Sequence, residues 1–413
     1  MISYIIYVLL SPIFWLLILL ATCFSVKIKT NYFSFYKYLK TAKRYISINK
    51  NNKEVLLFHA ASVGEYEQLQ PILRLIDRKK YFIIQSFTSP SIFNKEKDNS
   101  LYDVICYHPF DLPWLSITFF LTLKPSKYII TRHDIWPGHI VIAKSFKISI
   151  YYINGNIHKN SIWLKWYMQS IARYIFNKCN KIIVPSNYIA QNLYQLNILK
   201  NKVVICRDSR FDQIIYRKET SQNLYHISDI LSNDEVILFG SIDINDENII
   251  FDSLKNIFPK GTKDLIKQKK KIIFVPHETD HKTISRLEYK LNQLTFKYSI
   301  YSEAVFNNNS VIIVDTVGIL ADLYKYTCIA YIGGGFSRGV HSVLEPAIYN
   351  CYIGHGPNIE MLDEAKLLIN QGFSKIIYDI QDMNSFLLSS SNQKSNNLFD
   401  LESSNMILKE IVC

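Results

Sequence analysis

The stretch that decides the fold runs from Tyr331 to Pro357 and reads YIGGGFSRGVHSVLEPAIYNCYIGHGP. An apolar strand is expected at Cys328–Ile332 and leads into three consecutive glycines, where the backbone can approach a ligand without a Cβ in the way. A helix is expected to begin at Ser342, with Glu345 three residues later. A strand, a glycine turn and a helix N-terminus expose unpaired N–H groups to an anion. An ordinary turn with Ser342 and Glu345 as a capping box fits the same residues.

Short apolar runs alternate with helical patterns on both sides of this stretch. Their continuous β-branched character is typical of strands buried on both faces of a parallel sheet. The runs fall into two groups separated by a polar stretch, which predicts an α/β fold of two Rossmann-like, doubly wound domains. The expected strands are 55–59, 81–85, 103–107, 127–131, 148–153, 181–184 and 203–206 in the first group, and 236–240, 271–276, 311–315, 328–332, 351–354 and 375–378 in the second.

Composition limits the class of partner. The 413 residues are 48% hydrophobic and 20% charged, with a formal net charge of +12, which indicates an anionic partner. The chain has no arginine-rich run, so we expect an anionic membrane or a phosphorylated substrate and no nucleic acid. The seven cysteines are scattered without a CxxC pair, which is typical of reduced thiols in a cytosol-facing protein.

The first residues predict a membrane anchor. Ile2 to Phe24 are almost wholly apolar, long enough to span a bilayer core of ~30 Å, and basic residues follow. By the positive-inside rule, the sequence predicts a single N-terminal transmembrane helix with a cytoplasmic body. The expected organisation is a transmembrane anchor (1–26), a basic juxtamembrane segment (27–54), an acceptor-binding domain (55–214), a linker (215–234) and a donor-binding domain (235–413).

Polar residues collect just after the expected strands, where ligands bind in such sheets. Each has a structural alternative. Glu65 forms a Ser-x-x-Glu capping box with Ser62. His277-Glu278-Thr279-Asp280-His281 has the HExxH spacing of zinc peptidases, but it follows a strand and a proline, and no third ligand stands out. We therefore favour a nucleotide contact over zinc at His277.

A set of motifs, taken together and in order, resembles the 3-deoxy-D-manno-octulosonic acid (Kdo) transferases of lipopolysaccharide biosynthesis. The resemblance runs from the anchor to about residue 380. It is carried by Ala61-Ser62-Val63-Gly64-Glu65, Asp134-Ile135-Trp136-Pro137, Arg210-Phe211-Asp212, Asp315-Thr316-Val317-Gly318, Gly333-Gly334 through His341-Ser342-Val343-Leu344-Glu345, and Gly356-Pro357-Asn358.

The resemblance implies a GT-B fold and an inverting glycosyltransferase without a bound metal or other cofactor. It implies transfer of Kdo from CMP-Kdo to the lipid A precursor (lipid IVA) at the cytoplasmic side of the cell inner membrane. Glu65 matches the general base, and Asp134 and Arg210 match transition-state stabilisers. The matches to the donor-binding segments are Pro276, His277, Val317, Gly318, Ile319, Gly333, Gly334, Ser342, Val343, Leu344 and Glu345.

The sequence departs from the family pattern at several of these positions. Asp134 stands where the family has glutamate, and Arg210 where many members have lysine. Pro-His-Glu replaces Pro-Arg-His at Pro276, Ser342 replaces an asparagine, and Arg207 a glycine. Three alternatives stay open: a GT-B enzyme that uses a UDP-sugar, a non-catalytic membrane-anchored relic, and a zinc peptidase through His277, Glu278 and His281.

Overall fold

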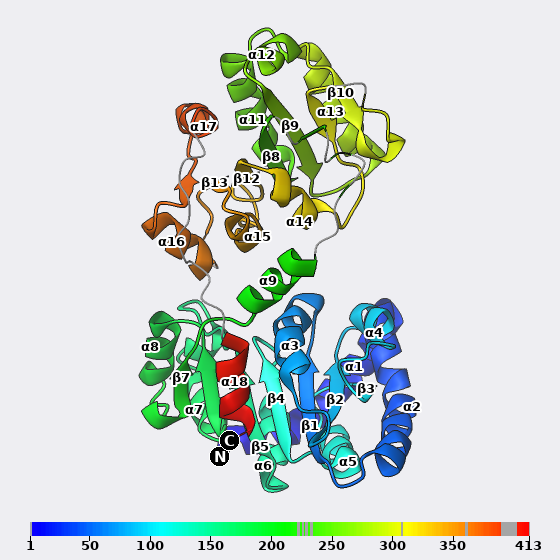
Figure 1. The fold of residues 1–413 in the computed structure, drawn as a ribbon. Coiled ribbons are helices and arrows are strands. Elements are labelled where there is room, and N and C mark those ends of the chain that lie inside the picture. The colour runs from blue at the N-terminus through cyan, green and yellow to red at the C-terminus, as the bar shows by residue number, and fades with distance from the viewer. Residues whose placement is uncertain are drawn as a thin grey trace. The chain divides into compact units, whose positions relative to one another are not determined.

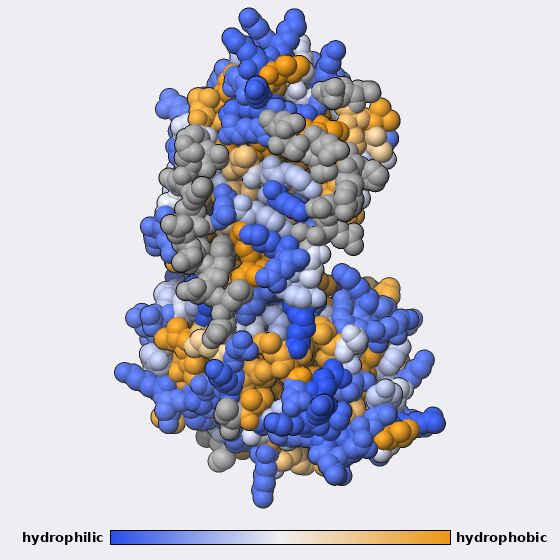
Figure 2. Space-filling view, in the orientation of Figure 1, coloured by the Kyte–Doolittle hydropathy of each residue, from blue (hydrophilic) through white to orange (hydrophobic). Residues whose placement is uncertain are grey.

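The computed structural model describes residues 2–220, 224, 227, 230–231, 234–306, 309–359, 362–389 and 403–412 (Figure 1). The chain divides into two units. The first unit comprises Met1–Gln213 with Leu401–Cys413, and the second comprises Ile214–Asp400. The visible face of each is mostly hydrophilic, with smaller apolar patches (Figure 2). Part of the expected linker, including 221–223 and 232–233, lies outside the described residues, whereas its first residues form the end of a helix.

The first unit is built on a seven-stranded parallel sheet with the order β3-β2-β1-β4-β5-β6-β7. Its strands are β1 (Glu54–Ala60), β2 (Tyr81–Phe87), β3 (Val104–Tyr107), β4 (Lys127–Thr131), β5 (Ser149–Ile153), β6 (Lys181–Val184) and β7 (Val203–Ile205). Its helices are α1 (Ile2–Phe24), α2 (Val26–Asn49), α3 (Val63–Leu75), α4 (Pro90–Glu96), α5 (Pro113–Leu123), α6 (Pro137–Ser145), α7 (Gln169–Phe176), α8 (Asn187–Gln195), the start of α9 (Arg210–Thr220) and α18 (Ser403–Val412).

The second unit contains another seven-stranded parallel sheet, with the order β10-β11-β9-β8-β12-β13-β14. Its strands are β8 (Glu235–Ile242), β9 (Lys270–Pro276), β10 (Tyr298–Ile300), β11 (Val311–Ile313), β12 (Ile329–Ile332), β13 (Tyr352–His355) and β14 (Ser374–Ile376). Its helices are α11 (Ile244–Ile257), α12 (Thr262–Lys267), α13 (His281–Gln293), α14 (Leu320–Leu323), α15 (Leu344–Ile348), α16 (Asp363–Asn370) and α17 (Ile380–Leu387).

The strands form because their apolar runs are buried on both faces. In β1 every residue after Glu54 is buried, and β9 is buried after its first residue. The two sheets confirm the expected α/β class with two Rossmann-like units. The strand order reverses direction between β1 and β4 in the first sheet and between β8 and β12 in the second. These are the switch points at which doubly wound sheets bind ligands, outside the carboxyl ends of the strands.

The N-terminal region differs in part from the expectation. Helix α1 has a segment, Ile5–Phe24, that is long and apolar enough to cross a membrane. The following basic segment is not a separate juxtamembrane stretch, because α2 is an amphipathic helix of the first unit. Its buried residues Phe35, Leu39 and Ala42 join the core of that unit, while its basic residues face outward.

The C-terminus also differs from the expected boundary of the second domain. Helix α18 belongs to the first unit, where Ile407 and Ile411 are fully buried. The carbonyl of Ile411 accepts a hydrogen bond from Lys127 Nζ at 2.8 Å, and Glu410 pairs with Lys181 at 3.2 Å. Order along the chain placed this helix in the second domain, but its apolar face packs on the first.

Candidate active site

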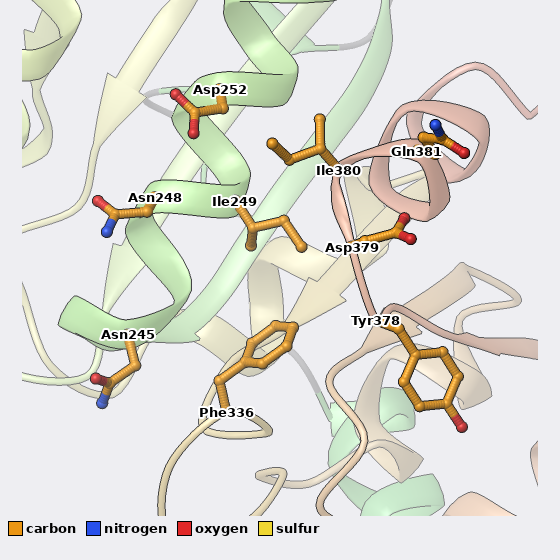
Figure 3. A pocket seen from close by; sticks show the side chains of 9 residues that line it. All are labelled: Asn245, Asn248, Ile249, Asp252, Phe336, Tyr378, Asp379, Ile380 and Gln381. Carbon is orange, nitrogen blue, oxygen red and sulfur yellow. The ribbon is translucent and has the colours of Figure 1, made fainter.

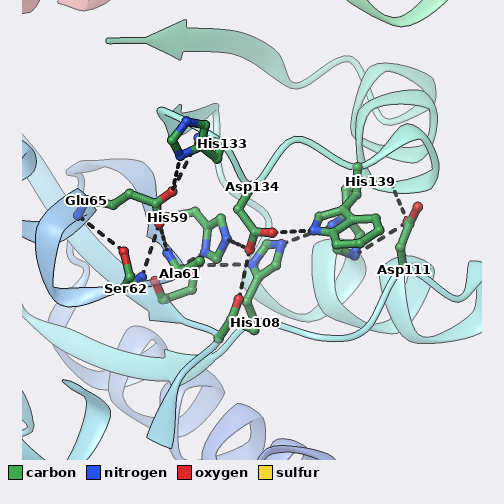
Figure 4. Close-up of polar contacts among 12 residues, drawn as sticks. His59, Ala61, Ser62, Glu65, His108, Asp111, His133, Asp134 and His139 are labelled. Atoms are coloured by element: carbon green, nitrogen blue, oxygen red, sulfur yellow. Dashed lines mark hydrogen bonds and ion pairs between the residues drawn. The ribbon is translucent and has the colours of Figure 1, made fainter. Parts of the chain in front are cut away.

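The first group of candidate residues lies at the switch point of the first sheet (Figure 4). Strand β1 ends at Ala60 and is followed by the start of α3, which carries Glu65. Strand β4 ends at Thr131 and is followed by a turn that carries Asp134. Because β1 and β4 are neighbours, the two carboxylates approach each other although they are far apart in sequence.

Glu65 is 5% exposed, and one of its two carboxylate oxygens already accepts two hydrogen bonds. Oε2 accepts backbone hydrogen bonds from Ala61 at 2.7 Å and from Ser62 at 3.1 Å, so the expected capping box is present. Among the described residues, the one hydrogen bond that Oε1 accepts is a long one, from the His133 N–H at 3.3 Å. Burial raises the pKa of Glu65, against the lowering effects of His59 and of the backbone N–H groups. Oε1 is therefore the oxygen that retains capacity to accept a proton.

The His133 ring lies beside Glu65, with Nδ1 at 3.8 Å from Oε1. Burial, with the nearby charge of Arg132, lowers the pKa of His133 to about 4. The imidazole is then neutral at neutral pH, so it does not neutralise the Glu65 carboxylate. Arg210 and Asp134 also act on the pKa of His133, in opposite directions, which places both charges near this ring.

Asp134 is held by three side-chain donors. His59 Nε2 contacts Oδ2 at 2.8 Å, Thr88 Oγ1 donates to the same oxygen at 2.9 Å, and Trp136 Nε1 donates to Oδ1 at 2.6 Å. Burial raises the pKa of Asp134, but these hydrogen bonds and the electrostatic attraction of His59 outweigh burial and bring the pKa to about 2. Asp134 therefore stays ionised where Glu65 tends toward protonation, so neighbouring carboxylates have opposite tendencies.

His59 begins a chain of buried polar groups that sequence reasoning missed (Figure 4). Its ring stacks on His108 at 3.7 Å, and Nδ1 lies 3.1 Å from Ser86 Oγ. His108 Nε2 lies 3.1 Å from His139 Nδ1, and His139 contacts Asp111 at 3.7 Å. Burial lowers the pKa of both His108 and His139, so these rings are neutral. The chain fixes the orientation of the ring that holds Asp134.

Arg210 completes the first group. It is the first residue of α9, and its backbone N–H is held by the Asp208 carboxylate at 2.8 Å. One guanidinium nitrogen lies 3.4 Å from the position that a Cβ on Gly64 would occupy, which places Arg210 beside the start of α3. Its Nε is buried and has no hydrogen-bond partner among the described residues. The structure thus brings together the three residues expected to be catalytic, Glu65, Asp134 and Arg210.

The second group of candidate residues lies at the switch point of the second sheet, in the glycine-rich loop after β12. The buried carboxylate of Asp246 organises this loop. It accepts hydrogen bonds from Gly334 N–H at 3.0 Å, from Tyr331 Oη at 2.8 Å and from Asp243 N–H at 2.9 Å. Position 333 has no room for a side chain, because a Cβ there would lie 2.4 Å from the carbonyl oxygen of Ser241. Sequence reasoning missed Asp246, although the capping-box spacing Asp243-x-x-Asp246 directly after β8 is a usable signal.

The helix expected at Ser342 was placed too early. Helix α15 begins at Leu344 and has only five residues, and Val343 at its N-cap makes no side-chain cap. Pro346 explains the difference. A helix capped by Ser342 would need the N–H of residue 346 for its first hydrogen bond, and proline has no N–H. The Ser342–Glu345 capping box is therefore wrong. Glu345 instead lies 3.8 Å from the Arg217 guanidinium.

The other donor-binding candidates fall into two places. Pro276 ends β9 opposite Ile242, and the His277 ring stacks on His341 of the glycine-rich loop at 4.6 Å. The structure therefore brings this pair to the loop. Val317, Gly318 and Ile319 form a separate turn between β11 and α14, in which Val317 is 80% exposed.

The HExxH residues do not share a helix. His277 follows β9, and α13 begins at His281 with Asp280 as its N-cap. Two histidine ligands one helical turn apart are therefore not formed. Within the described residues, no group of three or more histidine, cysteine, aspartate or glutamate residues is placed to hold a metal ion.

A pocket of about 540 Å³ lies in the second unit, next to the glycine-rich loop (Figure 3). Helix α11, the start of α17 and Phe336 of the glycine-rich loop form its walls. None of the residues expected to bind the donor lines it. The lining residues are Asn245, Asn248, Ile249, Asp252, Phe336, Tyr378, Asp379, Ile380 and Gln381.

Comparisons with known proteins agree with the motifs. A family model for 3-deoxy-D-manno-octulosonic-acid transferase (kdotransferase) matches residues 36–213. A 3-deoxy-D-manno-octulosonic acid transferase of Aquifex aeolicus is 26% identical over 319 residues, which cover 77% of this chain and 80% of that protein. Another, of Rickettsia felis, is 24% identical over 379 residues, which cover 87% of this chain and 78% of that protein. Both matches extend well beyond the first unit.

Solved structures with the same fold include sugar-nucleotide enzymes. The UDP-GlcNAc 2-epimerase of Methanocaldococcus jannaschii has a TM-score of 0.59 and 16% identity, and it covers 86% of this chain and 98% of that chain. The epimerase of Neisseria meningitidis has a TM-score of 0.56 and 12% identity, with coverage of 80% and 89%. At this identity the likeness concerns the fold alone, and it supports the expected GT-B fold of two Rossmann-like units.

Proposed function

We propose that the chain is a Kdo transferase, a glycosyltransferase of lipopolysaccharide synthesis, which transfers Kdo from CMP-Kdo to a lipid A precursor (lipid IVA) with inversion of the anomeric centre. The match to the family model over residues 36–213 and the similarity to Kdo transferases along most of the chain support this proposal. The observation that carries the proposal is the environment of Glu65. One carboxylate oxygen is saturated by two N–H groups, while the other retains room for a proton. An acceptor hydroxyl is a poor nucleophile and needs such a base.

In the proposed reaction, Glu65 Oε1 takes the proton of the acceptor hydroxyl. The hydroxyl oxygen forms the new bond to the anomeric carbon of Kdo as the bond from that carbon to the phosphate oxygen of CMP breaks. Arg210, whose Nε has no partner among the described residues, stabilises the negative charge that develops on the departing CMP. Ionised Asp134 holds the Trp136 indole and the His59 ring in place and stabilises positive charge that develops on the sugar.

We assign donor binding to the second unit. Main-chain N–H groups and small residues of the glycine-rich loop would receive the CMP moiety, and Glu345, an acceptor when ionised, would bind the ribose hydroxyls. The proposed donor-binding residues are Pro276, His277, Val317, Gly318, Ile319, Gly333, Gly334, Ser342, Val343, Leu344 and Glu345.

The experiment that tests this function is incubation of the purified protein with CMP-Kdo and a lipid A precursor, followed by mass analysis of the lipid. The expected result is a mass increase equal to one or more Kdo residues. In a parallel thermal-shift assay, CMP should stabilise the protein and UDP should not. No mass increase with a folded protein, or protection by UDP instead of CMP, would contradict the proposal.

We propose that the protein acts on the cytoplasmic face of the cell inner membrane, where α1 attaches it. The N-terminal helix is apolar, and the basic residues after it fit the cytoplasmic leaflet, whose surface is negative. A lipid acceptor with phosphates and acyl chains would be presented at the same surface.

Replacement of Glu345 by alanine should weaken CMP-Kdo binding by about tenfold or more, because a hydrogen bond to a charged group contributes ~1.5–3 kcal/mol. Titration calorimetry with CMP-Kdo would measure the affinity, and the melting temperature would report on the fold. The matched control is Glu303→Ala, an exposed glutamate of the same unit. Equal affinities of Glu345→Ala and the wild type would remove Glu345 from the donor site.

The rate of transfer should also depend on pH through Glu65. A base acts only when it is ionised, and burial raises the pKa of Glu65 above its ordinary value of 4.5. Turnover should therefore rise with pH through this raised pKa and level off above it, so the midpoint of the acid limb should lie above 4.5. A kcat profile across the mildly acidic range measures the midpoint. A midpoint below 4.5, at saturating substrates, would contradict the role of the buried carboxylate.

A further inference from the structure

Helix α1 is docked along the first unit instead of standing away from it. The Tyr7 hydroxyl lies 2.6 Å from both the carbonyl and Oδ2 of Asp111. Further along the helix, Trp15 Nε1 donates to Tyr32 Oη at 2.8 Å, and the Trp15 ring meets Trp114 edge-on at 6.4 Å. Contacts with the globular body therefore begin near the N-terminal end of α1, not only at its C-terminal end.

These contacts are incompatible with a helix that crosses the bilayer on its own. From Tyr7 to Phe24 an α-helix extends roughly 25 Å, close to the full hydrocarbon thickness. If α1 stood upright with its C-terminal end at the cytoplasmic surface, Tyr7 would lie near the opposite surface and would draw Asp111 into the lipid. Asp111 also accepts the N–H groups of Gly138 and His139 at the start of α6, both at 2.9 Å. Burying such polar groups of the body in hydrocarbon is strongly unfavourable.

The outward side of α1 is nevertheless apolar, and the apolar surface continues onto the body. On α5, Trp114, Ile117 and Leu121 are 39%, 40% and 50% exposed and lie on one face of the helix. Exposed aromatic residues of α2 add to it. We call this set the membrane-facing surface: Ile5, Ile6, Leu9, Leu10, Ile13, Phe14, Leu16, Leu17, Leu20 and Phe24 of α1, Phe33 and Tyr36 of α2, and Trp114, Ile117 and Leu121 of α5.

Charge identifies the occupant of this surface. No acidic residue precedes Glu54 in the chain, whereas basic residues are frequent on α2. The side chains of these α2 residues are exposed: Lys27, Lys29, Lys37, Lys40, Lys43 and Arg44. An apolar helix next to a purely basic amphipathic helix fits a bilayer with anionic headgroups, to which each basic residue near the surface contributes ~1 kcal/mol. A protein partner would not require this uniform sign of charge.

We propose that α1 lies in the plane of the membrane, with its apolar side in the outer part of one leaflet, and that α2 and α5 contact the same leaflet. This arrangement replaces the single transmembrane pass expected from the sequence. Helix α1 would insert only about 5–10 Å, as interfacial helices do. The proposal depends on the geometry of the first unit alone. Its test is therefore independent of whether the protein transfers Kdo.

Depth-dependent quenching tests the proposal on the full-length protein in vesicles of phosphatidylethanolamine and phosphatidylglycerol. Exposed Cys23 and the C-terminal Cys413 are first replaced by serine. Single cysteines at Ile5, Ile13 or Ile117 then carry an environment-sensitive fluorophore. The matched control is a cysteine at Ile266, an exposed apolar position of the second unit. Lipids with a spin label near the headgroup or near the end of the acyl chain serve as shallow and deep quenchers.

The expected result is that labels at Ile5, Ile13 and Ile117 are quenched to a similar extent by the shallow lipid and little by the deep lipid. The label at Ile266 should be quenched by neither. A helix that spans the bilayer would give a different pattern, with the Ile13 label strongly quenched by the deep lipid and the Ile117 label unquenched. That pattern, or no quenching at any position, would overturn the proposal.

Discussion

Replacement of Glu65 by glutamine should lower the turnover of Kdo transfer by ~10²–10⁴-fold, the typical contribution of a general base. Glutamine can keep the structural role of this residue, because its amide oxygen can accept the N–H groups of Ala61 and Ser62 as Oε2 does. Its amide nitrogen then stands in place of Oε1 and cannot take a proton. The affinity for CMP-Kdo and the melting temperature should stay close to those of the wild type.

Two further variants separate the catalytic role from the structural role. Ser62→Ala removes the other half of the capping box and should cost about 1 kcal/mol of stability without a comparable loss of turnover. Glu67→Gln removes a carboxylate from the same helix and should transfer Kdo nearly normally. If Glu65→Gln loses about as much stability as Ser62→Ala and still turns over at the wild-type rate, Glu65 is a capping residue only.

Replacement of Asp246 by alanine should destabilise the protein by about 2–5 kcal/mol and weaken CMP-Kdo binding. The variant leaves the Gly334 N–H and the Tyr331 hydroxyl buried without their acceptor, and each such loss costs ~1–3 kcal/mol. The glycine-rich loop would then lose the contact that fixes its backbone. Urea unfolding measures the stability of the variant, and calorimetry at low temperature measures the affinity of the folded fraction.

One control changes another carboxylate of the same helix, and the other makes a milder substitution at position 246. Asp252→Ala removes an exposed carboxylate from α11 and should change neither quantity. Asp246→Asn keeps an oxygen that can accept from Gly334, so it should recover much of the stability. If the Asp246→Ala variant is as stable as the wild type, the buried carboxylate does not hold the loop.

The sequence predicted most of the fold because the strands are buried on both faces. Continuous apolar runs such as the one that became β1 are a strong local signal. The exception is β10, a three-residue strand at the edge of the second sheet, which the sequence analysis did not anticipate. It is too short and too polar for a periodic pattern, and only its pairing with β11 in the structure identifies it as a strand.

The candidate site was predictable only in its outline. Glu65, Asp134 and Arg210 each follow an expected strand, so the parallel sheet alone brings the first two together. His59 is the last residue of the expected strand 55–59, but nothing in the sequence marks it as the partner of Asp134. Its partner Asp134 is 75 positions away, and only the three-dimensional structure joins the two. Asp246 was not predicted, because the sequence shows only its capping-box spacing with Asp243 and not that its carboxylate accepts a hydrogen bond from a loop far along the chain.

The return of α18 to the first unit has a consequence for dissecting the protein into pieces. In terms of sequence, the second unit is an insertion within the first, not a C-terminal addition. A fragment that stops at Gln213 would lack the segment that buries Ile407 and Ile411 and would expose the apolar surface beneath them. A fragment that joins residue 213 to residue 403 through a short flexible linker would restore that cover. Deletion of the last ten residues should therefore impair the folding of the first unit, most of which is encoded at the opposite end of the gene.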